Sequence, residues 1–126
     1  MLILNFSHPM TENQKKEAEA LTGQMIEQVF DIHVQFDNDR SYADQAETLM
    51  QQLPVDGTTL QTKPILILLP SSNFIAASVL ASLHGMMGYF PAVLRISPEA
   101  GSLPPVYHAA EVLNLQAIRD KSRRFR

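Results

Sequence analysis

Five consecutive apolar residues, Ile65 to Leu69, constrain the fold more than any other stretch of this sequence. The run lies between Pro64 and Pro70, and it is too short for a buried helix. Apolar residues without alternation are typical of a strand that is covered on both faces, as in the middle of a parallel sheet. The sequence therefore predicts a central strand here, with helices packed on both sides of the sheet.

An unusually apolar helix is predicted directly after this strand. Ser71, Ser72 and Asn73 can each cap a helix N-terminus, and Gly88 provides a stop. Nearly every position between them is apolar or small, so one face of the helix can cover the sheet while the other offers little to water. We expect residues 74–90 to form much of a two-fold interface with a second copy of the chain.

The remaining chain alternates between predicted strands and predicted helices. Strands are expected at 2–6, 31–36 and 92–96, with a short fifth at 107–113; helices are expected after a capping box at Thr11 and Gln14, after a cap at Ser41, and from Leu115 to about Arg123. Residues 54–63 are expected to be a long polar connection. This alternation predicts a single domain over residues 1–126 with an α/β fold: an open, mostly parallel, doubly wound sheet of Rossmann type with flanking helices. The expected strand order is 2-1-3-4, with the fifth strand at an edge.

Composition removes several classes of protein and site. The 126 residues include no cysteine, so disulfides and thiolate metal sites are excluded. The four histidines lack metal-ligand spacing, and neither a G-x-G-x-x-G nor a P-loop motif occurs, so we expect no metal and no cofactor. No apolar run approaches the ~20 residues that span a bilayer, and no basic segment precedes a signal core. The sequence therefore predicts a cytoplasmic protein without a membrane partner.

Charge is distributed unevenly along the chain. Residues 119–126 contain five basic residues and one acidic residue, a net charge of +4, whereas residues 1–118 contain five basic and twelve acidic residues, a net charge of −7. Two interpretations stay open for this basic tail. It can recruit a polyanion, or it can be a solvated helix end whose cations complement the helix dipole.

The expected ligand site lies beyond the carboxyl ends of the strands, where the strand order reverses between strands one and three. Two loops deliver candidate ligand-binding residues to this point: Asn5, Phe6, Ser7 and His8 from the first, and Pro70, Ser71, Ser72 and Asn73 from the third. Backbone N–H groups at the start of the third helix would suit a phosphate. Arg95 near the end of an inner strand either meets an anionic ligand or pairs with Glu99 or Glu111.

Ser7 and His8 are the most suggestive pair for a nucleophile and its base. No third group that would orient the histidine is visible, so a capping role or a ligand contact is the favoured interpretation of this pair. His84 lies within the apolar helix, where a buried, hydrogen-bonded structural role is favoured.

Three segments together resemble a known family: Leu-Ile-Leu-Asn-Phe-Ser-His-Pro at 2–9, His-Gly-Met-Met-Gly-Tyr-Phe-Pro at 84–91, and Asn-Leu-Gln-Ala-Ile-Arg-Asp at 114–120. They are similar to small Csx-type CRISPR-associated accessory proteins of type III systems, which are stand-alone relatives of the CARF (CRISPR-associated Rossmann-fold) domain. The resemblance covers nearly the whole chain. It implies a homodimer that recognises cyclic oligoadenylate, and cyclic tetra-adenylate has a symmetry that matches a dimer. Its adenines could then be read by Asn5, Asn73 or Asn114.

Three functions follow as hypotheses. The favoured one is binding and sequestration of the cyclic messenger, which would dampen type III antiviral signalling. The second is a metal-independent ring nuclease, since members of the family have been grouped with enzymes that cut this messenger. The third is a protein-interaction subunit that docks through its apolar helix. No DNA partner is expected, and assembly beyond a dimer on ligand binding is left open.

Overall fold

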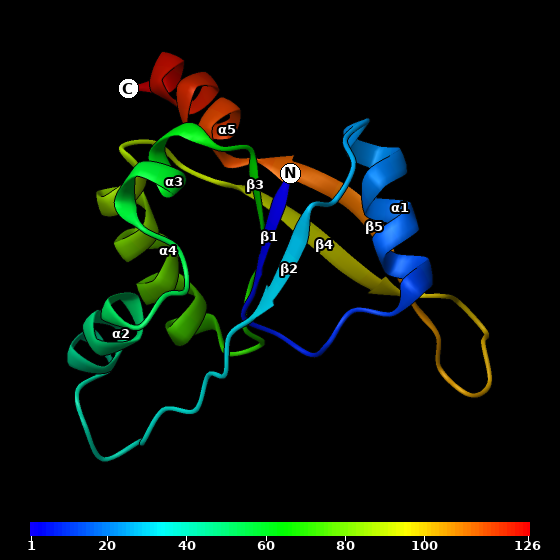
Figure 1. The fold of residues 1–126 in the computed structure, drawn as a ribbon, viewed down its shortest axis with the longest axis horizontal. Coiled ribbons are helices and arrows are strands. Elements are labelled where there is room, and N and C mark those ends of the chain that lie inside the picture. The colour runs from blue at the N-terminus through cyan, green and yellow to red at the C-terminus, as the bar shows by residue number, and fades with distance from the viewer.

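The computed structural model describes residues 1–126 and contains one five-stranded sheet (Figure 1). Its strands are β1 (Leu2–Asn5), β2 (Gln28–Asp31), β3 (Ile65–Leu68), β4 (Ala92–Pro98) and β5 (Tyr107–Asn114). Their spatial order is β2-β1-β3-β4-β5, with the first four parallel and β5 antiparallel to β4. The predicted open, mostly parallel α/β sheet is confirmed, and so is the predicted strand order.

Helices cover both faces of this sheet. They are α1 (Glu12–Thr22), α2 (Tyr42–Gln51), α3 (Gly57–Thr62), α4 (Asn73–Met87) and α5 (Leu115–Ser122), followed by the short 3-10 helix η1 (Arg123–Phe125). Helix α1 lies on one side of the sheet and α2 with α4 on the other, whereas α5 lies at one end of the strands (Figure 1). None of these helices combines the length and the apolar character needed to cross a bilayer.

Strand β3 organises the core, as its apolar run predicts. Ile65 and Ile67 enter the layer beneath α2 and α4, and Leu66 and Leu68 enter the layer beneath α1. All four side chains are buried. Because full burial of such a side chain stabilises the fold by about 1.5–3 kcal/mol, this strand holds the two layers together.

The helix ends follow the predicted caps. Thr11 and Gln14 form a complete capping box at the start of α1. Ser72 caps α4, and Gly88 ends that helix in the left-handed region at φ 81°, which glycine adopts without the steric cost of a Cβ atom.

Two predicted elements are wrong in position or type. The second strand ends at Asp31 instead of running through 31–36, because β1 ends at Asn5 and provides no ladder partner beyond it. Residues 32–36 still alternate between partly buried and exposed, which imitates a strand pattern. The polar connection at 54–63 contains helix α3, which Asp56 caps and Leu60 anchors with a fully buried side chain.

Helix α4 presents a face of small residues to the solvent. Ala77, Ala81 and Gly85 are exposed, and Phe74 at the start of the helix is 69% exposed. Met87, in contrast, is buried in the core. The exposed surface of α4 is therefore smaller than the predicted interface over residues 74–90. We call the exposed residues Phe74, Ala77, Ala81 and Gly85 the α4 outer face.

Candidate functional site

Two loops predicted to converge do line one cleft at the carboxyl end of the strands. The β1–α1 loop contributes Phe6, Ser7, His8 and Pro9; the β3–α4 connection contributes Pro70, Ser71 and Ser72; the segment after β2 contributes Ile32, His33 and Val34; and Ile75 comes from α4. The cleft has a volume of about 400 Å³. It lies between β1 and β3, where the strand order reverses, which is the usual ligand position in open α/β sheets.

Asn5 shapes this cleft from beneath. Its side chain is fully buried, and its amide nitrogen donates to the His8 carbonyl at 2.8 Å and to Asp31 Oδ1 at 2.9 Å. Its amide oxygen accepts the Ser7 N–H at 2.9 Å. Asn5 was predicted to contact a ligand, and its three side-chain hydrogen bonds instead join β1 to the loop after it and to the end of β2.

Hydrogen-bond donors line the cleft, and charged side chains do not. The backbone N–H groups of His8, Ser71 and Ser72 donate to no acceptor in the chain, and the Ser7 and Ser71 hydroxyls make no hydrogen bond. No aspartate, glutamate, lysine or arginine contributes to the lining. Such a site suits an anion or a polar ring that is held by N–H and O–H groups.

Two other predicted site residues at this end of the sheet point their polar groups elsewhere. Asn73 is exposed outside the cleft lining, and its side-chain oxygen accepts the N–H of Phe74 at 2.9 Å. Arg95 Nε donates to Glu111 Oε1 at 2.7 Å across the β4–β5 pair, with both side chains half exposed. The ion pair with Glu111, one of the two alternatives for Arg95, is thus present.

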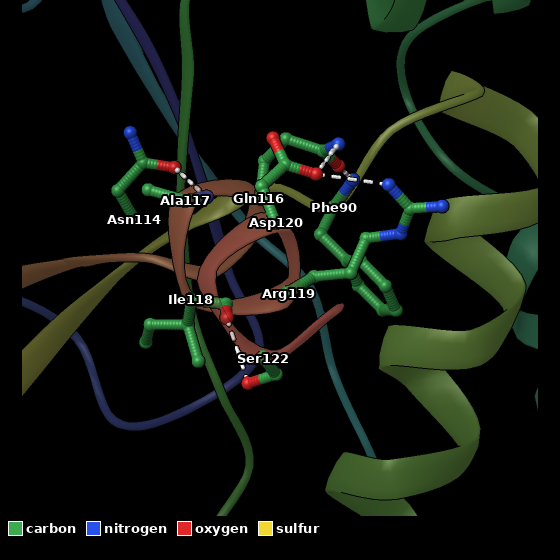
Figure 2. A network of polar contacts seen from close by, with 8 residues as sticks. All are labelled: Phe90, Asn114, Gln116, Ala117, Ile118, Arg119, Asp120 and Ser122. Carbon is green, nitrogen blue, oxygen red and sulfur yellow. Dashed lines mark hydrogen bonds and ion pairs between the residues drawn. The ribbon is translucent and has the colours of Figure 1, made fainter. Parts of the chain in front are cut away.

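Asn114 lies at the opposite end of the sheet from the other predicted residues. It pairs with Ala92 at the start of β4, because β5 runs antiparallel, and its side chain caps α5 by accepting the Ala117 N–H at 3.0 Å (Figure 2). Next to it, Gln116 Oε1 accepts the Phe90 N–H at 2.9 Å, which ties α5 to the chain leading into β4. The structure therefore does not bring Asn114 together with the Ser7 and Ser71 loops in one chain.

His33 is a cleft residue that the sequence prediction missed. The alternation of residues 31–36 indicated a strand, but residues 32–34 leave the end of β2 and line the cleft. His33 Nε2 lies 3.3 Å from Gln35 Oε1 and shares an adjoining hollow with Arg40. A polar residue at every second position within the predicted strand at 31–36 was the only signal available.

His84 takes a different role from the predicted buried hydrogen bond. It is partly buried and stacks on Phe90 with ring centroids 4.1 Å apart, and no hydrogen bond to its ring is formed. Elsewhere, no three histidine, aspartate or glutamate side chains gather in the way that a metal site needs.

Comparison with protein-family models, with curated proteins and with solved structures finds no match to this chain. The cleft is therefore interpreted from its own geometry and chemistry.

Proposed function

We propose that two copies of this chain bind one cyclic oligoadenylate, most specifically cyclic tetra-adenylate, across a two-fold axis and sequester it, which would dampen type III antiviral signalling. The ligand class comes from the resemblance of segments 2–9, 84–91 and 114–120 to Csx-type accessory proteins. The single observation that supports it best is the acid-free cleft at the strand-order reversal, lined by unengaged N–H and O–H donors. Phosphate oxygens and adenine ring nitrogens are acceptors that match those donors.

The size of the cleft favours a shared ligand. Its volume of about 400 Å³ is near the lower end of the ~300–1,000 Å³ typical of small-molecule pockets. A ring of four nucleotides is too large for one such cleft. Two clefts related by a two-fold axis would each hold half of a ring with matching symmetry.

The α4 outer face is the surface on which we place the second copy. Next to this face, the hydroxyls of Ser78 and Ser82 donate to carbonyls of their own helix, at 2.9 Å each, so the surface around it offers few free polar groups. Helix α4 also begins at the cleft, since Ser72 and Ile75 line it, so a contact along α4 would bring two clefts near each other. The chain exposes 7994 Å² of surface, about 1,300 Å² more than the ~6,700 Å² expected for a monomer of this mass. This excess is larger than the area of about 800 Å² that each partner buries in a stable interface.

Ring opening is the second candidate function, and one observation favours it. His8 and His33 line the same cleft, and two imidazoles can act as base and acid in the attack of a ribose 2′-OH on its phosphate. No carboxylate lines the cleft to orient either ring, so we place sequestration first.

Calorimetric titration with cyclic tri-, tetra- and hexa-adenylate tests the proposed ligand. We expect tight binding of the tetramer at one ring per two chains. Chromatography after single-turnover incubation separates the two candidate functions. Intact ring supports sequestration, whereas linear products that form about 10²–10⁴-fold more slowly in His8→Ala and His33→Ala would establish the nuclease. Absence of binding to all three rings would refute both and leave the protein-interaction subunit.

Light scattering tests the second copy. Ala81→Arg places a charge on the α4 outer face without touching the core, and we expect it to convert a dimer into a monomer. Ala20→Arg, at an exposed alanine of α1, is the matched control and should leave the dimer intact. Met87→Glu would not serve, because Met87 is buried and the variant should unfold. A monomeric native protein would refute the shared site.

A further inference from the structure

The last helical segment, α5 with η1, concentrates the positive charge of an otherwise acidic chain. The segment has one acidic side chain, Asp120, and five basic ones: Arg119, Lys121, Arg123, Arg124 and Arg126. Arg119 Nη1 pairs with Asp120 Oδ1 at 2.9 Å (Figure 2). The other four cations form no ion pair. Cations near a helix C-terminus complement its dipole, but the effect fades within the last turn and does not need four unpaired charges.

The same segment projects from the sheet and is anchored only at its start. Gln116 and the Asn114 cap hold its first turn (Figure 2). No residue of α5 or η1 is buried, and residues 117–126 are all exposed. Its ribbon lies at one end of the sheet (Figure 1). The cations are therefore accessible from several sides.

Phe125 distinguishes between the polyanions that could bind there. It is 90% exposed and lies between Arg124 and Arg126 in sequence. An exposed aromatic ring among guanidinium groups is the combination on which unpaired bases stack while cations contact the phosphates. A membrane surface would require a long continuous apolar helix face, but this segment has only 8 residues in α5 and 3 in η1, and Ser122 interrupts the side that carries Ile118 and Phe125.

We propose that α5 and η1 form a docking element for a single-stranded polynucleotide. This inference uses different residues and the opposite end of the sheet from the proposed ring site, and it does not depend on that site. The four unpaired cations contact phosphates, and Phe125 stacks on a base. Because single strands expose base faces and duplexes do not, single strands should bind more tightly than duplexes of the same length.

Fluorescence anisotropy with a labelled twelve-nucleotide oligouridine and the matching oligothymidine tests this proposal on the full chain. We expect the slope of log K against log salt to be about −3, since each of four phosphate contacts adds about −0.7 for single strands. The two oligonucleotides separate RNA from DNA as the natural source, and DNA binding would also correct the expectation of no DNA partner. No binding to either at 50 mM KCl with protein at about 10⁻⁴ M, the weak limit for non-specific contacts, overturns the proposal.

Three variants, one of them a control, test whether binding depends on this segment. Arg123→Glu with Arg124→Glu should weaken binding about 10-fold or more and halve the salt slope. Arg40→Glu with Lys63→Glu, two exposed cations outside any ion pair, is the matched control and should change affinity less than 3-fold. Phe125→Leu keeps an apolar side chain but removes the ring, and it should weaken binding about 5-fold or more. Equal losses in both charge variants, full affinity in Phe125→Leu, or tighter binding to phosphatidylserine vesicles than to either oligonucleotide would overturn it.

Discussion

The two ends of the parallel strands in this sheet present opposite chemistries. At the carboxyl end, the loops after β1 and β3 surround a cleft without charged side chains, and its binding groups are N–H and O–H donors. At the amino end, α5 and η1 present unpaired cations on an exposed helix. On the two proposals above, the protein would bind phosphate in two ways, by directed hydrogen bonds in a shaped cleft and by charge on an open surface.

Two asparagines that end strands give the largest contrast in stability. Asn5→Ala leaves the Ser7 N–H, the His8 carbonyl and Asp31 without their buried partner, and we expect a loss of about 2–4 kcal/mol in the free energy of unfolding. Asn114→Ala removes only an exposed helix cap and should cost about 0.5–2 kcal/mol. Urea unfolding measures both. Equal losses would show that the Asn5 hydrogen bonds do not organise the carboxyl end.

Hydroxyls in the cleft should matter for ligand binding and not for folding. Ser7→Ala with Ser71→Ala removes two hydroxyls that make no hydrogen bond within the chain, and we expect cyclic tetra-adenylate to bind about 1–3 kcal/mol more weakly. Calorimetry measures this loss. Ser122→Ala, which removes a hydroxyl at the amino end, is the control and should keep full affinity. Ser72 is unsuitable for this test because it caps α4.

Salt should separate the two ends in a single protein. Binding of cyclic tetra-adenylate should change less than about 3-fold between 50 and 200 mM KCl, because no lysine or arginine lines the cleft. Binding of the oligonucleotides at α5 and η1 should fall about 50-fold or more over the same range. Titration of both ligands at four salt concentrations checks the pair. Similar slopes for the two ligands would mean that one cationic surface binds both.

The smallest effect concerns Asp56, the N-cap of α3. The backbone N–H of Thr59, and then its side chain, donate to this carboxylate and hold its pKa below the usual 3.8. The folded chain therefore binds fewer protons here than the unfolded chain, so this contribution is present above about pH 4 and is lost as pH falls through the lowered pKa. Asp56→Asn keeps a cap that does not titrate. The urea midpoint of this variant should therefore fall slightly less between about pH 5 and pH 3 than the midpoint of the unmodified protein. Parallel profiles would contradict this.

Much of the fold follows from local sequence chemistry. The continuous apolar run of β3 requires cover on both faces, and the caps at Thr11, Ser41 and Ser72 mark where helices begin. Because parallel strands share one direction, the loops after β1 and β3 had to meet at one end of the sheet. The convergence of the Ser7 and Ser71 loops in the cleft was predictable for that reason.

The misplaced elements depended on information outside their own segments. Strand β2 ends where β1 ends, so its boundary depends on a ladder partner that periodicity does not reveal. The direction of β5 is set by pairing with β4, and it carries Asn114 to the far end. Helix α3 has only 6 residues, and one buried side chain, that of Leu60, holds it against the core. His33 joins the cleft only because the strand stops early.

The buried amide of Asn5 has a consequence for the energetics of recognition. Because it already holds the loop from Ser7 to His8 in place, a ligand entering the cleft would not need to order that loop on arrival. The loss of conformational entropy that usually accompanies binding at a flexible loop then occurs during folding, when the loop is fixed around Asn5. A cleft of donors on a fixed loop is thus preorganised, and an uncharged site can bind an anion tightly when its hydrogen-bond donors are already in place.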